Sequence, residues 1–212
     1  MPESSTERIV GAPAPSLCLD FVNTRCWRGT PRPSDSLDGF DALQRWLRQS
    51  GVVDTVTADR LQALPAADAA AAQRLFQDAR DARESLYALL QALAAALPVP
   101  APALAALAQR VAAAPPRDRL VLSSQASGWR VAMRRPDAAE VLAPVWWSAG
   151  DLALASGRLR LRCCANPQCG WLFLDDSKSG TRRWCSMSAC GNRAKVQRHA
   201  QRQRGFRPPS NR

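Results

Sequence analysis

The chain has 212 residues, a length that suits one sizeable domain plus a smaller one. Its net charge is +11. Its longest apolar stretch, residues 86–108, contains Gln91 and three prolines, so we expect no membrane-spanning segment. The first seven residues carry two acids and no apolar run, which argues against a signal peptide and favours a cytoplasmic protein.

The first 157 residues predict a mostly helical domain with a few strands. Residues 1–15 are polar and contain three prolines, so we expect a loose start. Residues 16–24 hold a dense apolar run that includes Phe21 and Val22, which predicts a buried strand. Proline, glycine and arginine then predict a loop over residues 28–33.

Apolar side chains next recur at helical spacing from Leu37 to Leu47, and Gly51 ends that pattern. A small hairpin is expected after the prolines at 115 and 116, and a helix follows it that Pro144 should kink or split. The remaining expected elements are helices at Thr57–Leu64, with Thr57 as N-cap, Ala66–Leu97, Leu104–Ala114 and Pro136–Ser156, and hairpin strands at Leu120–Ser123 and Trp129–Met133.

Ser156-Gly157 marks the expected boundary between an N-terminal domain, residues 1–157, and a C-terminal module, residues 158–212. Arginine and leucine alternate after it, as in a strand. The module should contain a knuckle, a hairpin and a helix, which is a treble-clef-like arrangement in an α+β protein. Its expected elements are strands at Arg158–Cys164 and Gly170–Asp175, a hairpin over Gly170–Trp184, a return strand at Arg182–Cys185, and a helix at Ala189–Gln203 with Ser188 as N-cap.

Four cysteines give this module its chemistry: Cys164 and Cys169 form one C-x4-C pair, and Cys185 and Cys190 form another. Zinc takes four such thiolates at the corners of a tetrahedron, and a site with four protein ligands has no open position for catalysis. We therefore expect one structural Zn²⁺ per chain. Cys163 could replace Cys164, because neighbouring side chains on an extended chain point in opposite directions, but only Cys164 gives two identical spacings.

Two other interpretations of the cysteines remain open, a chance cluster of reduced thiols and a disulfide framework. Disulfides belong to oxidising compartments, and nothing in the sequence is typical of a secreted protein. Cys18 and Cys26 lie far from the cluster without a partner motif, so we expect them to be ordinary core or near-surface residues.

The excess positive charge lies entirely in the C-terminal module. Residues 158–212 contain 13 basic and 2 acidic residues, whereas residues 1–157 contain 16 of each. Charge segregated in this way indicates a polyanionic partner, above all nucleic acid. An acidic membrane surface would require an apolar stripe that the tail lacks, and a merely solubilising tail is the remaining alternative.

The chain resembles the CGNR zinc-finger family, preceded by an ABATE domain, over most of its length. The signature itself is Cys190-Gly191-Asn192-Arg193, and the segments that carry the rest of the resemblance are Cys164–Asp175, Arg183–Met187 and Leu17–Thr24. The resemblance implies a bacterial, stress-induced transcription regulator with an N-terminal domain and a DNA-binding zinc module.

The expected last helix has a basic face. Lys195, Arg198 and Arg202 fall within a sector about 60° wide when the helix is wound at 100° per residue. Such a face could follow a DNA groove, with phosphate contacts and an occasional guanine contact. Arg182, Arg183 and Arg193 should add further contacts, so the candidate nucleic-acid-binding residues are Arg182, Arg183, Arg193, Lys195, Arg198 and Arg202.

Several nearby residues have a structural and a functional interpretation. Asn192 could contact a base or phosphate, or hold the knuckle backbone, and Gly191 should leave room for a neighbour. Val196 and Ala200 should pack on the hairpin. His199, the only histidine, is expected to face solvent or phosphate. The three aromatic residues of the module should cover the zinc rather than stack on bases: Trp171, Phe173 and Trp184.

Three functions are compatible with these features. The first is a regulator that binds double-stranded DNA, with an N-terminal domain that senses a small molecule, forms a homodimer, or does both. The second is an RNA-binding or ribosome-associated zinc protein, because basic helices bind both polymers. The third is an enzyme with a site around Asp20 and Asn23, but the N-terminal domain has no histidine, phosphate-binding loop or nucleophile motif, so we expect no enzymatic activity.

Overall fold

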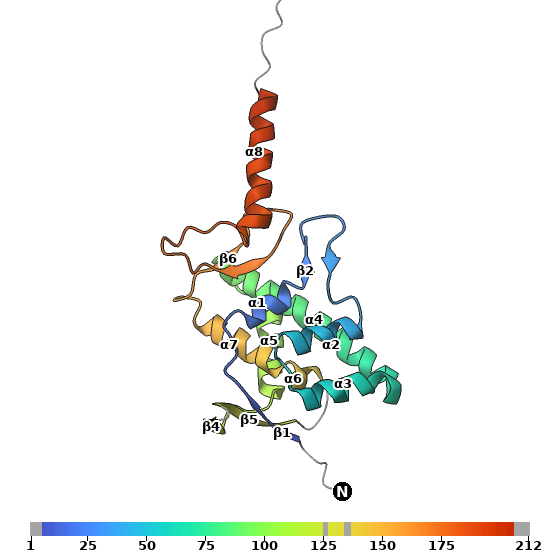
Figure 1. Ribbon diagram of the computed structural model, residues 1–212. Coiled ribbons are helices and arrows are strands. Elements are labelled where there is room, and N and C mark those ends of the chain that lie inside the picture. Colours follow the sequence, from blue (N-terminus) through green and yellow to red (C-terminus); the bar gives the residue numbers. More distant parts are fainter. Residues whose placement is uncertain (1–5, 125–126, 134–136, 206–212) are drawn as a thin grey trace, which may run out of the picture.

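The computed structural model describes residues 6–124, 127–133 and 137–205, without the side chains of residues 6, 133, 198, 199 and 201–205. A helical body carries a small sheet at one end and the cysteine module at the other, from which one helix projects (Figure 1). The expected mixed α+β class is confirmed. The helices of the body are α1 (Leu17–Val22), α2 (Phe40–Gln49), α3 (Thr55–Ala67), α4 (Ala69–Ala94), α5 (Ala101–Ala113), α6 (Ala138–Val141) and α7 (Ala143–Leu154).

The segment expected as a buried strand at residues 16–24 is instead the short helix α1, so that prediction is wrong. Every residue of α1 except Asp20 is buried. A run that is apolar on all sides shows neither helical nor strand periodicity, so its sequence does not distinguish the two. The Ser148 hydroxyl accepts a 3.1 Å hydrogen bond from the Cys18 backbone amide, which satisfies one donor in the first turn of the helix.

Aspartates cap the first turns of both α3 and α4. The Asp54 carboxylate caps α3 by accepting a 2.8 Å hydrogen bond from the Thr57 amide. The N-cap is therefore Asp54 and not Thr57, which the sequence analysis expected. The Asp68 carboxylate caps α4 through the Ala71 amide at 2.8 Å. The split expected at Pro144 is confirmed, because α6 ends at Val141 and Pro144 lies in the first turn of α7.

The sheet at the far end contains the expected hairpin, formed by β4 (Leu120–Leu122) and β5 (Ser127–Met133). A third strand, β1 (Thr6–Val10), pairs antiparallel with β5, so residues 6–10 are part of a sheet, whereas residues 1–5 of the expected loose start lie outside the described residues. In β1, Arg8 and Val10 are buried while Glu7 and Ile9 face solvent. Gly128 permits this pairing, since a Cβ there would lie 2.4 Å from the carbonyl oxygen of Val10.

The core surrounds α4 and includes a fully buried arginine. Arg83 is 1 % exposed and donates 2.7 and 2.6 Å hydrogen bonds to the two carboxylate oxygens of Asp35, and a 3.0 Å bond to the Thr24 hydroxyl. Asp35 belongs to the two-stranded arm of β2 (Arg25–Cys26) and β3 (Ser34–Asp35). The ion pair therefore fixes this arm to α4.

The cysteine module begins with an antiparallel hairpin of β6 (Leu161–Cys163) and β7 (Leu172–Leu174). The hairpin thus flanks the first cysteine pair and does not span Gly170–Trp184 as expected, and residues 175–186 contain no strand. The Asp175 carboxylate, which is buried, organises that segment by accepting hydrogen bonds from the amides of Ser177 and Arg182, both at 3.1 Å.

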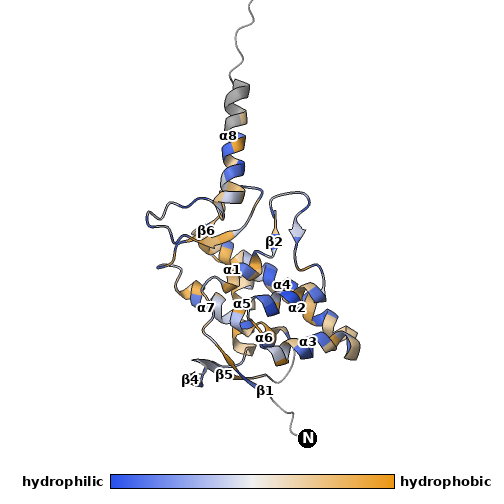
Figure 2. Ribbon diagram, in the orientation of Figure 1, coloured by the Kyte–Doolittle hydropathy of each residue, from blue (hydrophilic) through white to orange (hydrophobic). Residues whose placement is uncertain are grey.

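A π-helical turn, Met187–Gly191, leads into α8 (Asn192–Gly205). Its N-cap is Ser186, whose hydroxyl accepts from the Ala189 amide, rather than the expected Ser188. Figure 1 shows α8 pointing away from the body, and Figure 2 shows hydrophilic bands along its first turns.

Candidate metal centre and nucleic-acid interface

The four expected ligand cysteines form one cluster. The sulfurs of Cys164, Cys169, Cys185 and Cys190 all lie within 4.8 Å of one another. The Sγ of Cys185 is 3.7 Å from that of Cys169 and 3.8 Å from that of Cys190. Four sulfurs bound at about 2.3 Å to one tetrahedral zinc would be about 3.8 Å apart. The donor set and these spacings fit a tetrahedral metal ion held by thiolates.

Different elements bring these sulfurs together. Cys164 and Cys169 lie at the two ends of the turn that joins β6 to β7, whereas Cys190 lies in the π-helical turn and is 2 % exposed. The Ala165 amide donates a 2.8 Å hydrogen bond to the carbonyl oxygen of Arg183, which joins the two halves of the site. The cluster is therefore built into backbone hydrogen bonding of the module.

Cys163 is exposed and is not part of the cluster, while the adjacent Cys164 is buried within it. The choice of Cys164 over Cys163 agrees with this arrangement. All seven cysteines are free thiols, including Cys18 and Cys26 in the body. Burial raises the pKa of Cys18 to about 11, so it is an inert core residue at neutral pH.

Contacts among the sulfurs shift their protonation. The hydrogen bond with Cys185 lowers the pKa of Cys169 to about 5. The same contact is the main reason that the pKa of Cys185 is raised. The lowered pKa favours the thiolate form of Cys169, which is the form that binds metal.

Polar and small residues around the cluster hold its shape. The Nδ2 of Asn166 donates a 3.6 Å hydrogen bond to the sulfur of Cys190, and its Oδ1 accepts a 3.1 Å hydrogen bond from the Gln168 amide. Hydrogen bonds of this kind orient metal ligands. A Cβ at Gly191 would lie 2.8 Å from the Met187 sulfur, so the glycine leaves room for a neighbouring side chain rather than for the backbone.

The aromatic residues of the module pack on the cysteines as expected. Phe173 is buried with the cluster, and Trp171 and Trp184 pack against it half-buried. The sequence analysis missed a fourth member, Trp27, which reaches this small core from the β2–β3 arm of the body. The Arg193 guanidinium lies 4.3 Å from the centre of the Trp27 ring, a cation–π contact that joins α8 to the body.

Further contacts join the module to the body. Asn23, directly after α1, donates through Nδ2 to the Leu172 carbonyl at 2.8 Å and accepts from the Leu172 amide at 3.0 Å. The Tyr87 hydroxyl donates to the carbonyl oxygen of Gly170 at 2.8 Å. Leu161 and Leu172 are part of the main hydrophobic core. Asn23 thus has a structural role at the end of helix α1, and the spacing of the cysteines gave no sign of this contact surface between body and module.

The expected nucleic-acid-binding residues divide into three groups. Arg182 is held within the module, because its guanidinium donates to the carbonyl oxygens of Trp184 at 3.0 Å and Cys185 at 2.5 Å. Arg183, Arg193 and Lys195 are exposed, and the last two lie in the first turn of α8. The side chains of Arg198, His199 and Arg202 lie outside the described residues, although α8 includes their positions.

Two smaller expectations concern α8. Val196 is 68 % exposed, so it does not pack on the hairpin as expected; the helix points away from the body and leaves this residue no surface to cover. The Asn192 amide donates a 3.2 Å hydrogen bond to the carbonyl oxygen of Ser188, which agrees with the backbone-holding interpretation of this residue.

Over the part of the chain that the structure describes, no helix is both long and apolar enough to cross a membrane.

Two family models match the chain. The model described as "CGNR zinc finger" matches residues 160–203. The model named ABATE and described as "Putative stress-induced transcription regulator" matches residues 16–156, which is more than half of the chain. Neither description names an enzymatic activity. A search of curated proteins finds no match.

Proposed function

Since the chain belongs to the ABATE family and ends in a match to the CGNR zinc finger, we propose that it is a DNA-binding transcription regulator of the bacterial stress response. In this proposal the cysteine module binds duplex DNA and the N-terminal domain receives the signal. The protein acts in the cytoplasm, at the nucleoid.

One observation carries the proposal: α8 is a basic helix that begins directly at the cysteine cluster and points into solvent (Figure 1). Its sequence has five basic residues and no acidic one. A rigid cluster at its base fixes the direction of such a helix, and a helix of this diameter fits the major groove. Arg193 and Lys195 lie exposed at its start, and Arg183 lies exposed in the segment before the π-helical turn, so all three can neutralise phosphates.

The cluster holds one structural Zn²⁺ in this proposal, with Cys164, Cys169, Cys185 and Cys190 as its ligands. Zinc supplies the cross-link between the knuckle and the π-helical turn. The module has few buried residues of its own, so a metal contributes much of its stability. The geometry of the sulfurs described above supports zinc or another ion of tetrahedral preference, and the zinc-finger match favours zinc.

The division of labour follows the charge. Residues 1–157 have no net charge and supply no counterion-release contribution to DNA binding, whereas residues 158–212 carry a net charge of +11. We place the domain boundary at Gly157 on this basis. A neutral helical domain suits signal sensing, homodimer formation, or both, and a homodimer would present two modules to two half-sites.

The test is a binding selection with the full-length, zinc-loaded protein on a random duplex DNA library. A specific regulator enriches one sequence motif, and its affinity for that motif falls linearly with salt on a logarithmic scale. Structured RNA is added as a competitor. Displacement of the DNA by RNA, with no enriched motif, would support the RNA-binding alternative instead.

A further inference from the structure

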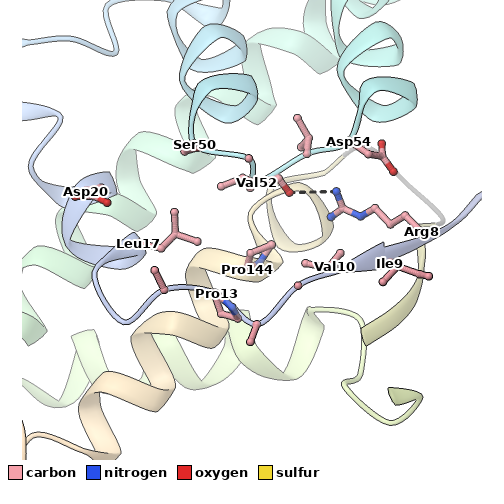
Figure 3. Close-up of a pocket in the computed structure, with 15 residues that line it drawn as sticks. Arg8, Ile9, Val10, Pro13, Leu17, Asp20, Ser50, Val52, Asp54 and Pro144 are labelled. Atoms are coloured by element: carbon pink, nitrogen blue, oxygen red, sulfur yellow. Dashed lines mark hydrogen bonds between the residues drawn. The ribbon is translucent and has the colours of Figure 1, made fainter. Parts of the chain in front are cut away.

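A cavity lies beside α1 at the sheet end of the body, about 360 Å³ in volume (Figure 3). This volume falls within the range of about 300–1,000 Å³ typical of small-molecule sites. Other hollows on the surface have similar volumes, so size alone does not distinguish this one. Its wall is formed by the end of β1, the following segment, the start of α1, the α2–α3 loop and Pro144.

The side chain that distinguishes this cavity is Arg8. It is 6 % exposed, and its Nη1 donates a 3.2 Å hydrogen bond to the carbonyl oxygen of Val52. Its Nε and Nη2 are buried and have no hydrogen-bond partner among the described residues. Figure 3 shows the guanidinium reaching from β1 toward Val52, with Leu17, Pro13 and Pro144 beyond it.

The two unpartnered nitrogens are the pair that a carboxylate recognises. The Nε–H and Nη2–H bonds of a guanidinium run parallel along one edge, so that both oxygens of one carboxylate can accept from them at once. A buried charged donor without a partner costs free energy in the folded protein. A ligand carboxylate that reached these two nitrogens from the cavity would remove this cost.

The protein's own carboxylates do not fill this position. No ion pair within 4.0 Å joins Arg8 to a carboxylate among the residues described. Burial lowers the pKa of Arg8, and the more distant charges of Asp54 and Glu140 oppose that shift. The Asp54 carboxylate is already committed to capping α3.

We propose that this cavity binds a small monocarboxylate, whose carboxylate accepts from Nε and Nη2 of Arg8 and whose apolar part lies against Val10, Leu17 and Pro144. This rests on the proposed function, because it gives the chemical class of the signal that the N-terminal domain receives. Asp20 and Asp54 also line the cavity. Their negative charge disfavours a doubly charged phosphate more than a singly charged carboxylate.

The position of the cavity suits a signal for the cysteine module. Leu17, at the start of α1, lies in the cavity wall, and Asn23, directly after α1, holds Leu172 of the module. A helix of six residues is only about 9 Å long, so the two contacts lie on one short rigid element.

The experiment uses the full-length, zinc-loaded protein and calorimetric titration with benzoate and hexanoate. Benzyl alcohol and hexanol serve as neutral probes of the same shape. We expect binding of at least one carboxylate and much weaker binding of its neutral counterpart. Arg8→Met should weaken carboxylate binding at least about tenfold, the effect of losing a charge-assisted bidentate contact. Arg119→Met, an exposed arginine near the same sheet, is the matched control and should leave the affinity unchanged.

A second variant keeps the test valid if Arg8→Met does not fold. Ala12→Trp places a large side chain at the exposed rim of the cavity and leaves Arg8 in place. It should also weaken benzoate or hexanoate binding while the melting temperature stays near that of the wild type. Equal affinity of all variants for the carboxylates, no response to either at tens of millimolar, or a response to inorganic phosphate alone would overturn the proposal.

Failure of this proposal is distinguishable from failure of the regulator function. The titration uses no DNA, and the binding selection described above uses no carboxylate. If the protein binds neither carboxylate but still selects a DNA motif, only the cavity assignment is refuted. If it binds a carboxylate but selects no DNA motif, only the regulator function is refuted.

Discussion

Asn23 and Leu172 exchange two hydrogen bonds although 149 positions separate them in the chain. The Asn23 side chain copies the pairing of a neighbouring strand, because its amide offers one donor and one acceptor to the backbone of β7. The body thus completes the edge of the β6–β7 hairpin, and the cysteine module is joined to it by specific polar contacts.

Asn23→Ala should destabilise the protein by about 2–4 kcal/mol, because it leaves the buried amide and carbonyl of Leu172 unsatisfied. Urea unfolding of the zinc-loaded protein measures this change. Asn192→Ala is the matched control, since it removes one exposed hydrogen bond and should change the free energy of unfolding by less than about 0.5 kcal/mol. Equal effects of the two variants would contradict the role assigned to Asn23.

Replacement of any one of the four clustered cysteines by serine should abolish stoichiometric zinc binding. Structural zinc contributes roughly 10–16 kcal/mol of apparent binding free energy in small finger peptides, so residues 158–204 should lose their order while the helical signal of the body persists. Elemental analysis and circular dichroism measure the two effects. Cys163→Ser should retain one zinc per chain, because Cys163 lies outside the cluster.

The basic residues of α8 should determine DNA affinity. Lys195→Ala should weaken binding to all sequences and lower the salt slope by about one if Lys195 contacts a phosphate. Arg198→Ala and Arg202→Ala should act in the same way, or cost roughly 1–3 kcal/mol at one operator position if they contact guanine. A triple variant with full zinc content and an unchanged salt slope would refute the assignment of α8.

Arg182 should behave differently from Lys195. Its guanidinium holds the carbonyl oxygens of Trp184 and Cys185, so Arg182→Ala should lower thermal stability and retention of zinc against a chelator. Lys195→Ala should leave both quantities at the wild-type value, because that side chain is exposed. This contrast separates a residue that builds the site from one that contacts its partner.

The Arg83–Asp35 pair should make stability depend on pH. Burial would raise the pKa of Asp35, but hydrogen bonds from Arg83 and the Leu37 amide outweigh it and leave that pKa below its ordinary value. A lowered folded pKa gives stability that is present above the unfolded aspartate pKa of about 3.9 and is lost as pH falls through the folded value. The stability difference between wild type and Asp35→Asn should therefore shrink on acidification in urea titrations.

The sequence predicted those parts of the molecule whose signal is local. The positions of proline and glycine predicted helix ends close to those observed in the structure. The spacing of the cysteines predicted which four of them form the cluster. The contact partners of Asn192 and Gly191 are Ser188 and Met187, each four positions earlier in the chain, so these contacts are also local.

Features that depend on distant contacts were mispredicted or missed. Residues 17–22 are apolar except for Asp20, and their packing within the body decides that they form a helix. Asp54 and Thr57 are both acceptable N-caps by residue type, and the start of the helix decided between them. No local sequence motif indicated the roles of Arg8, Arg83 and Trp27, because each contacts a partner far away in the chain.

The seam between body and module also sets an order of events during synthesis. Trp27 and Asn23 leave the ribosome early, yet their partners in the module follow well over a hundred residues later. At about 5–20 residues per second, this surface of the body waits for about 7–30 s before it is covered. With the zinc site proposed above, metal capture would be the last step of maturation, and a cell short of zinc would accumulate chains whose bodies are folded but whose docking surface stays open to chaperones and proteases.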